Sequence, residues 1–162
     1  MMTVAIGSAT TIRTSHAFGV RDARTLRDVV LSSVHIGALW GALVLVSFIA
    51  FSGVMPMAFT PNEQVIALGS RLIVLVALYQ VSDAIQGTMV GVLRGMQDVR
   101  IIATLSFVAY VLLNIPVGYL FAFTLGMGAE GLMIGYIVGL TTAAICYSVR
   151  VGGHLRRLRK SL

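Results

Sequence analysis

Apolar residues gather into five long runs along this chain of 162 residues, and short polar stretches separate the runs. Each of the last four runs exceeds the roughly 20 residues that a helix needs to cross a membrane. The first would cover only about 25 Å at the helical rise per residue. We therefore predict an all-α, polytopic membrane helix bundle with four full transmembrane helices and one truncated N-terminal helix. The expected helices cover about residues 3–19, 25–54, 61–94, 101–124 and 130–151, followed by a basic tail at 152–162.

Local signals refine the third and fourth helices. In the stretch TPNE, Thr60 can cap the third helix, Pro61 suits its first position and Glu63 completes a capping box. Pro116 interrupts the fourth helix and frees the carbonyl four residues earlier, with Asn114 near enough to help satisfy the backbone. A packing kink and a hinge are both open interpretations of Pro116.

Composition supports the membrane prediction. Hydrophobic residues make up 57% of the chain and charged residues only 11%, whereas a soluble domain carries about a quarter charged residues. The formal net charge of +6 raises the question of nucleic acid. The basic residues, however, form short clusters between apolar runs rather than stripes interleaved with aromatic side chains. Lipid is therefore an expected partner, and nucleic acid is not.

Basic residues also predict the orientation. They follow the first run, flank the connection after the third run and fill the tail, whereas the connections after the second and fourth runs hold neither Lys nor Arg. By the positive-inside rule, the three basic regions lie on the cytoplasmic side. We expect a multi-pass protein of the plasma (bacterial inner) membrane with a cytoplasmic C-terminus. The residues concerned are Arg21, Arg24, Arg27, Arg94, Arg100, Arg150, Arg156, Arg157, Arg159 and Lys160.

Glycine recurs every fourth residue in two of the runs. Small residues at this spacing let helix backbones approach closely in lipid, where packing drives helix association. Two such triplets predict packing seams in a compact bundle. The triplets are Gly87, Gly91 and Gly95 in the third run and Gly131, Gly135 and Gly139 in the fifth.

A single carboxylate lies deep inside the third run, in the stretch LYQVSDAIQG. Asp83 precedes Arg94 by 11 residues, so it lies about 16 Å from the cytoplasmic boundary, near the bilayer midplane. A charge there costs roughly 2.5–3.5 kcal/mol and usually faces a bundle interior or a water-filled cavity. Tyr79, one turn earlier, and Gln86, three residues later, lie on or beside the same face. Asp83 is thus a candidate proton carrier or cation ligand, and the alternative is a protonated acid that hydrogen-bonds to a neighbouring helix. Arg94 is expected to be an interfacial anchor.

Enzyme functions are not expected. An intramembrane aspartyl protease needs two membrane aspartates that share a proton, and only Asp83 lies in a run. Ser33 and His35 lie two residues apart on one helix and face apart, so they do not form a nucleophile and base. No residue spacing fits a metal site built from side chains, and Cys146 lies in an apolar run where a packed thiol is expected.

Two segments, LYQVSDAIQGTMVGVLRGMQDVR and NIPVGYLFAFTLGMGAEGLMIGYIVGL, resemble the multidrug and toxic compound extrusion (MATE) family. An earlier segment, GSATTIRTSHAFG, resembles the second helix of that family's C-terminal lobe. The resemblance spans about residues 3–155 and is most specific across 78–140. The matching positions are Ala9, Arg13, Gly19, Gln80, Asp83, Gln86, Gly91, Leu93, Arg94, Gly95, Asp98, Pro116, Gly128, Gly131 and Gly135.

The resemblance implies a two-lobed secondary transporter that expels hydrophobic, often cationic compounds in exchange for Na⁺ or H⁺. This chain would be a fragment of the C-terminal lobe with its last five helices, and its missing partners would be the N-terminal lobe and the first helix of its own lobe. Asp83 matches an acidic cation-site residue, and Tyr79 matches a tyrosine beside that site. Asp83 would be a metal ligand only if the coupling ion is Na⁺, and no cofactor is expected. The candidate cavity-lining residues are Gln86, Gln80 and Asn114.

Other membrane functions stay open at this point. In a small membrane subunit or a channel component, Asp83 would be a structural or pore-lining residue. A flippase for a lipid-linked substrate is a third option, although its cavity should carry more charge. Neither the coupling ion nor the substrate follows from the sequence.

Overall fold

The computed structural model describes residues 2–160, with only the backbone for residues 159 and 160. Over that range the chain consists of helices and short connections without a strand, which confirms the predicted all-α membrane bundle. Two stretches, η2 (Val108–Asn114) and η3 (Leu120–Thr124), are π-helical, and η1 (Pro56–Ala58) is a 3₁₀ turn. The α-helices are α1 (Met2–Gly19), α2 (Ala23–Phe51), α3 (Glu63–Gly95), α4 (Val99–Phe107), α5 (Ile115–Tyr119) and α6 (Ala129–Lys160).

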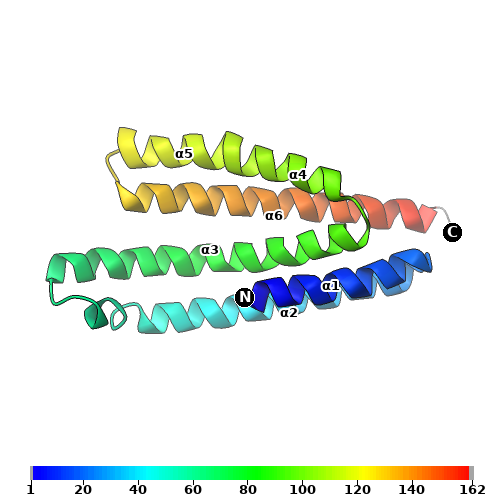
Figure 1. Ribbon diagram of the computed structural model, residues 1–162, viewed down its shortest axis with the longest axis horizontal. Helices are drawn as coiled ribbons and strands as arrows, with labels where there is room; N and C mark the ends of the chain where they lie inside the picture. The colour runs from blue at the N-terminus through cyan, green and yellow to red at the C-terminus, as the bar shows by residue number, and fades with distance from the viewer. Residues whose placement is uncertain (1, 161–162) are drawn as a thin grey trace.

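The helices lie side by side along one direction, with α3 in the middle (Figure 1). α3 packs against α1 and α2 on one side and against α6 on the other, and the rod from α4 to η3 packs against α6. Among the described residues, four helices are long and apolar enough to cross a membrane, and α1 is not one of them. Those four spans are Ala23–Phe51, Glu63–Gly95, Val99–Thr124 and Ala129–Leu158.

Side-chain caps fix the starts of α2 and α3. The Oδ1 of Asp22 accepts hydrogen bonds from the backbone N–H groups of Arg24 and Thr25, at 2.9 and 3.2 Å. The expected capping box at the start of α3 is wrong. The cap is Asn62, whose Oδ1 accepts from the N–H of Gln64 at 3.0 Å. The hydroxyl of Thr60 instead accepts a hydrogen bond from the N–H of Asn62, so it satisfies a backbone group in the turn that precedes the helix.

The last helix is longer than the sequence suggested. We expected it to end near residue 151, but α6 continues to Lys160 through the basic stretch. Arg and Leu are good helix formers. Where apolar residues give way to basic ones, the helix therefore passes from lipid into water but keeps its helical conformation. Cations in the last turn also interact favourably with the negative end of the helix dipole.

The fourth span is a single rod in which α-helical and π-helical turns alternate. Pro116 lies in the first turn of α5, directly after the π-helical stretch η2. Proline has no N–H to donate to the carbonyl four residues earlier. That carbonyl, of Leu112, lies in a stretch whose hydrogen bonds already follow the wider π pattern. The helix therefore continues past the proline instead of ending there.

The glycine triplets lie where two helix pairs approach most closely. On α3, a Cβ at Gly91 would collide with the backbone of Gly7 in α1, and one at Gly95 would lie 2.6 Å from the Cβ of Thr14. On α6, a Cβ at Gly135 would lie 2.6 Å from the Cα of Gly118. Since most of these neighbours are backbone atoms, any larger residue would push the helices apart.

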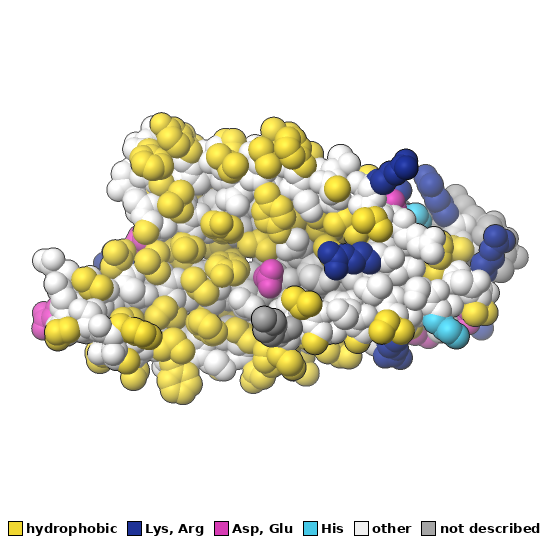
Figure 2. Space-filling model, viewed as in Figure 1, with side chains coloured by type: hydrophobic (Ala, Val, Ile, Leu, Met, Phe, Trp, Pro, Cys, Tyr) yellow, Lys and Arg dark blue, Asp and Glu magenta, His cyan; other side chains and the backbone are white. Residues whose placement is uncertain are grey.

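The outer surface is apolar over most of its length. Leu39 and Val149, for example, are 74% and 70% exposed. Figure 2 shows hydrophobic side chains spread over the face in view, whereas most Lys and Arg side chains gather toward the end at which α6 terminates. A surface of this kind needs lipid around its middle and water around its basic end. We call this end, with the α1–α2 and α3–α4 connections, the basic end.

Candidate functional site

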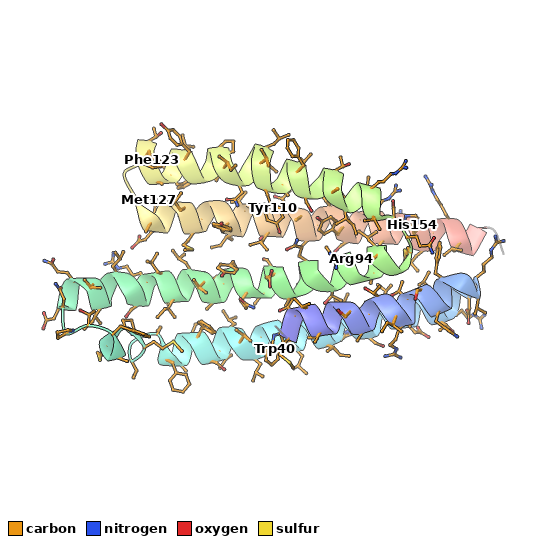
Figure 3. All side chains as sticks on the ribbon, viewed as in Figure 1. Trp40, Arg94, Tyr110, Phe123, Met127 and His154 are labelled. Atoms are coloured by element: carbon orange, nitrogen blue, oxygen red, sulfur yellow. The ribbon has the colours of Figure 1, made fainter. Side chains whose placement is uncertain are left out.

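A cleft of about 300 Å³ opens between α1, α3 and η2. Tyr110 of η2 and Arg94 of α3, which both line it, are labelled in Figure 3. Six of its side chains are polar, and the other lining residues are glycine or valine. The lining residues are Thr3, Val4, Gly7, Ser8, Asp83, Gln86, Gly87, Val90, Gly91, Arg94 and Tyr110.

Asp83 provides the only carboxylate of the cleft. It lies 11 residues before Arg94, so about 16 Å of helix separates the two along α3. The three ion pairs among the described residues use other groups, and no hydrogen bond joins Asp83 to another described side chain. The carboxylate is half-buried and faces the cleft. A charge at this depth is costly unless a proton or cation neutralises it.

Tyr110 and Gln86 add oxygen atoms next to the carboxylate. The phenol of Tyr110 is half-buried and lines the same cleft as Gln86 and Asp83. Phenol, amide and carboxylate oxygens can all accept from an ammonium group or face a small cation. The ring of a tyrosine also attracts cations through its π face. Around Asp83 the cleft thus combines one negative charge with neutral cation-binding groups, while the cation Arg94 lines its basic end.

The structure separates the other residues that the sequence suggested for the site. Tyr79, Gln80 and Asn114 do not line the cleft. The Asn114 side chain packs at the contact between η2 and α6, next to Gly139. The described part of α1 lies beside the segment of α3 that runs from about Gly87 to the basic end. The cleft therefore extends from Asp83 toward Arg94, whereas Tyr79 lies one turn further away from it.

Two ionisable residues of the cleft were not expected there. Arg94 was assigned to the membrane interface, but it lines the cleft at its basic end. A signal was present, because residues 83, 87, 90, 91 and 94 follow the helical repeat and share one face. Tyr110 had no such signal, since it is on another helix and only the packing of η2 beside α3 brings it near Asp83.

No resident metal centre is apparent in the described part of the chain, where no three His, Cys, Asp or Glu side chains are grouped.

A second polar cluster lies at the basic end. There Asp98, in the α3–α4 connection, accepts hydrogen bonds from Arg150 at 2.8 Å and binds His154 at 2.7 Å. Arg150 first, and then His154, hold the pKa of the Asp98 carboxyl below its usual range. This cluster fixes the α3–α4 connection to α6.

Comparison with known proteins identifies the family. The MatE family model matches residues 1–120. The chain is 33% identical over 155 residues to the multidrug resistance protein MdtK of Photorhabdus laumondii and 35% identical over 155 residues to NorM of Vibrio vulnificus. Each alignment covers 93% of this chain but only 34% of the relative, so the chain spans about a third of their length.

Solved structures agree with this result. The eukaryotic MATE transporter AtDTX14 superimposes with a TM-score of 0.82 at 25% identity, over 98% of this chain and 37% of that protein. An inward-facing multidrug resistance MATE family transporter of the MOP superfamily gives a TM-score of 0.85 at 19% identity, over 95% of this chain and 36% of that protein, which supports the fold. The chain belongs to the MATE family of multi-pass membrane transporters.

Proposed function

We propose that this chain forms part of a secondary active multidrug efflux antiporter that exports hydrophobic, often cationic compounds in exchange for Na⁺ or H⁺. The observation that carries the proposal is the position of Asp83, a carboxylate that forms no ion pair with another described side chain and lies in a cleft at the middle of a membrane-spanning helix. The names of the relatives, multidrug resistance proteins, support the same class of activity.

Electrostatics explains how one carboxylate can couple two fluxes. A single negative charge in a medium of low dielectric is neutralised by one proton, one Na⁺ or one organic cation. A second cation would then meet a neutral or positive site, so the two ligands exclude each other. Such exclusion is the exchange that an antiporter requires. Asp83 would hold the cation, while Gln86 and Tyr110 would supply neutral oxygen atoms beside it.

The complete transporter would need a second lobe and one further helix beside this chain. We assign the chain to the C-terminal lobe, where it would pack against the first helix of that lobe and face an N-terminal lobe. Relatives about three times as long support the view that the chain corresponds to one part of a larger transporter. The chain would lie in the bacterial inner membrane with its basic end, and so its C-terminus, in the cytoplasm.

A chimeric transporter tests the role of Asp83. The chain replaces the matching third of Vibrio vulnificus NorM, and Asp83→Asn is compared with Glu63→Gln. Both exchanges turn a carboxylate into an amide on α3, but Glu63 lies in the exposed first turn, far from the cleft. We expect Asp83→Asn to abolish ethidium efflux at unchanged membrane expression, whereas Glu63→Gln retains it. Efflux that continues without the Asp83 carboxylate would exclude it as the coupling site.

A direct binding measurement makes the test independent of the chimera. The chain is placed in lipid nanodiscs, and the binding of tetraphenylphosphonium, a hydrophobic cation, is measured by equilibrium dialysis. The Asp83→Asn chain should lose the binding that the Glu63→Gln chain keeps. Added protons or Na⁺ should weaken the binding, because they compete for the same charge.

A further inference from the structure

A second hollow, separate from the cleft of Asp83, lies on α6 at the basic end. It is a groove of about 200 Å³, lined by Val149, Arg150, Gly153, His154 and Arg157. A water molecule occupies about 30 Å³ of liquid, so the groove has room for an anion and not only for solvent. The proposed transport function makes no use of it.

One row of residues on α6 connects this groove to the lipid-facing surface. Ile145, Val149, Gly153 and Arg157 follow one another at intervals of four, so they form a line along one face of the helix. Ile145 and Val149 are 58% and 70% exposed. A Cβ at Gly153 would meet nothing within 4 Å. The line therefore begins as an exposed apolar track, opens into a gap at the glycine and ends at a guanidinium group.

The groove also has hydrogen-bond donors to spare. Arg150 uses its Nε to bind Oδ2 of Asp98, and a guanidinium has four further N–H donors. His154 uses Nε2 for the same carboxylate oxygen. Arg157 makes no ion pair with any described residue. Two guanidinium groups thus face the groove against a single carboxylate, which already has its partners.

We propose that this groove binds the phosphate group of an anionic phospholipid whose acyl chains lie along Ile145 and Val149. Arg150 and Arg157 would hold the phosphate, for which the planar guanidinium fork is well suited. The location agrees with this ligand, because Asp98, which binds Arg150, directly follows the α3 span that ends at Gly95, and headgroups lie where spans end. Basic pockets at this level of transmembrane bundles recognise acidic headgroups. The apolar track distinguishes a lipid from a free phosphate ion.

Two pairs of matched variants test the proposal. The delipidated chain is titrated in neutral detergent with phosphatidylglycerol or phosphatidylcholine, and bound lipid is counted by native mass spectrometry. Arg157→Gln removes a charge from the groove, and Arg156→Gln removes the same charge from the neighbouring position outside it. Gly153→Leu fills the groove without a change in charge. Gly152→Leu adds the same side chain where a Cβ also meets nothing within 4 Å but the groove is not touched.

We expect Arg157→Gln to weaken phosphatidylglycerol binding about fivefold, the factor typical of one basic residue near an anionic membrane surface. Gly153→Leu should also weaken it, because the added side chain occupies the space of the phosphate. Their matched controls should change it less than about twofold. Phosphatidylcholine should bind more weakly than phosphatidylglycerol. Equal losses in the two arginine variants would show a diffuse charge effect and overturn the proposal.

A competition experiment distinguishes a bound lipid from a bound soluble anion. Inorganic phosphate and glycerol 3-phosphate are added to the chain with phosphatidylglycerol bound. Neither should displace the lipid at equal concentration, since neither has acyl chains to place along α6. Displacement by either compound at equal concentration would show a soluble anion site and refute the lipid assignment.

Discussion

The contact between α5 and α6 gives the sharpest test of the fold, because it joins backbone to backbone. A Cβ at Gly135 would lie 2.6 Å from the Cα of Gly118, 2.8 Å from its N and 2.9 Å from the carbonyl oxygen of Asn114. Ordinary contacts of a Cβ begin at 3.4 Å. No change of rotamer can relieve these contacts, so Gly135→Ala must move one helix away from the other.

The expected change in the free energy of unfolding follows from two opposing effects. Overpacking of a tight interface costs about 1–3 kcal/mol, while exchange of glycine for alanine inside a helix gains about 0.8–1.0 kcal/mol. Gly152 lies on the same helix, and a Cβ there meets nothing within 4 Å. Gly152→Ala should therefore show the gain alone. The two variants should differ by about 1–3 kcal/mol in the free energy of unfolding, with Gly135→Ala the less stable.

Unfolding of the chain in mixed micelles, with SDS as denaturant, measures this difference by circular dichroism. The comparison cancels helix propensity, since both variants make the same change on the same helix. If Gly135→Ala proves as stable as Gly152→Ala, then α5 and α6 do not approach each other as closely as the structure indicates.

Four further outcomes are expected. Tyr147→Phe, which removes the 2.6 Å hydrogen bond to Ser106, should lower the free energy of unfolding by about 0.6 kcal/mol, and by at most about 1.7 kcal/mol, in the same SDS titration. The Asp98 carboxyl has a lowered pKa in the folded chain, so its stabilisation is present above the unfolded pKa and is lost as the pH falls through the folded value. Wild-type stability should thus fall in acid more steeply than that of Asp98→Asn, and parallel pH curves would contradict this. In the nanodisc assay, Tyr110→Phe should weaken tetraphenylphosphonium binding more than Tyr79→Phe, because only the first residue lines the cleft. Liposomes that contain this chain alone should show no concentrative, ion-dependent uptake, and such uptake would contradict the need for a second lobe.

Much of the site was accessible from the sequence because it lies on one helix. The depth of Asp83 follows from its distance to a basic boundary, and the helical repeat places Gln86 and Gly87 beside it. The same repeat also places Arg94 on this face, although its charge suggested an interfacial role. Tyr79 shows the limit of the method. A residue one turn away is near Asp83 along the helix, but its neighbour across the interface decides whether it faces the cleft.

Local chemistry was less predictable than the helices themselves. Thr60 and Asn62 are both suitable caps, and only the path of the chain after η1 decides that Asn62 is the one used for α3. Similarly, the end of α6 was expected where the apolar run ends. A helix that leaves a membrane has no need to stop, because basic residues with good helix propensity extend it into water.

The sequence by itself determined the class of this protein. Its apolar runs, alternating basic clusters and intramembrane carboxylate depend on solvation, which acts on each segment separately. The tertiary structure alone decided which groups share a hollow. Tyr110 and Asp83 line one cleft, and Arg150 binds Asp98, across contacts between helices that are distant in the chain. These pairings depend on how closely two backbones approach, and that distance is set jointly by both helices and their glycines.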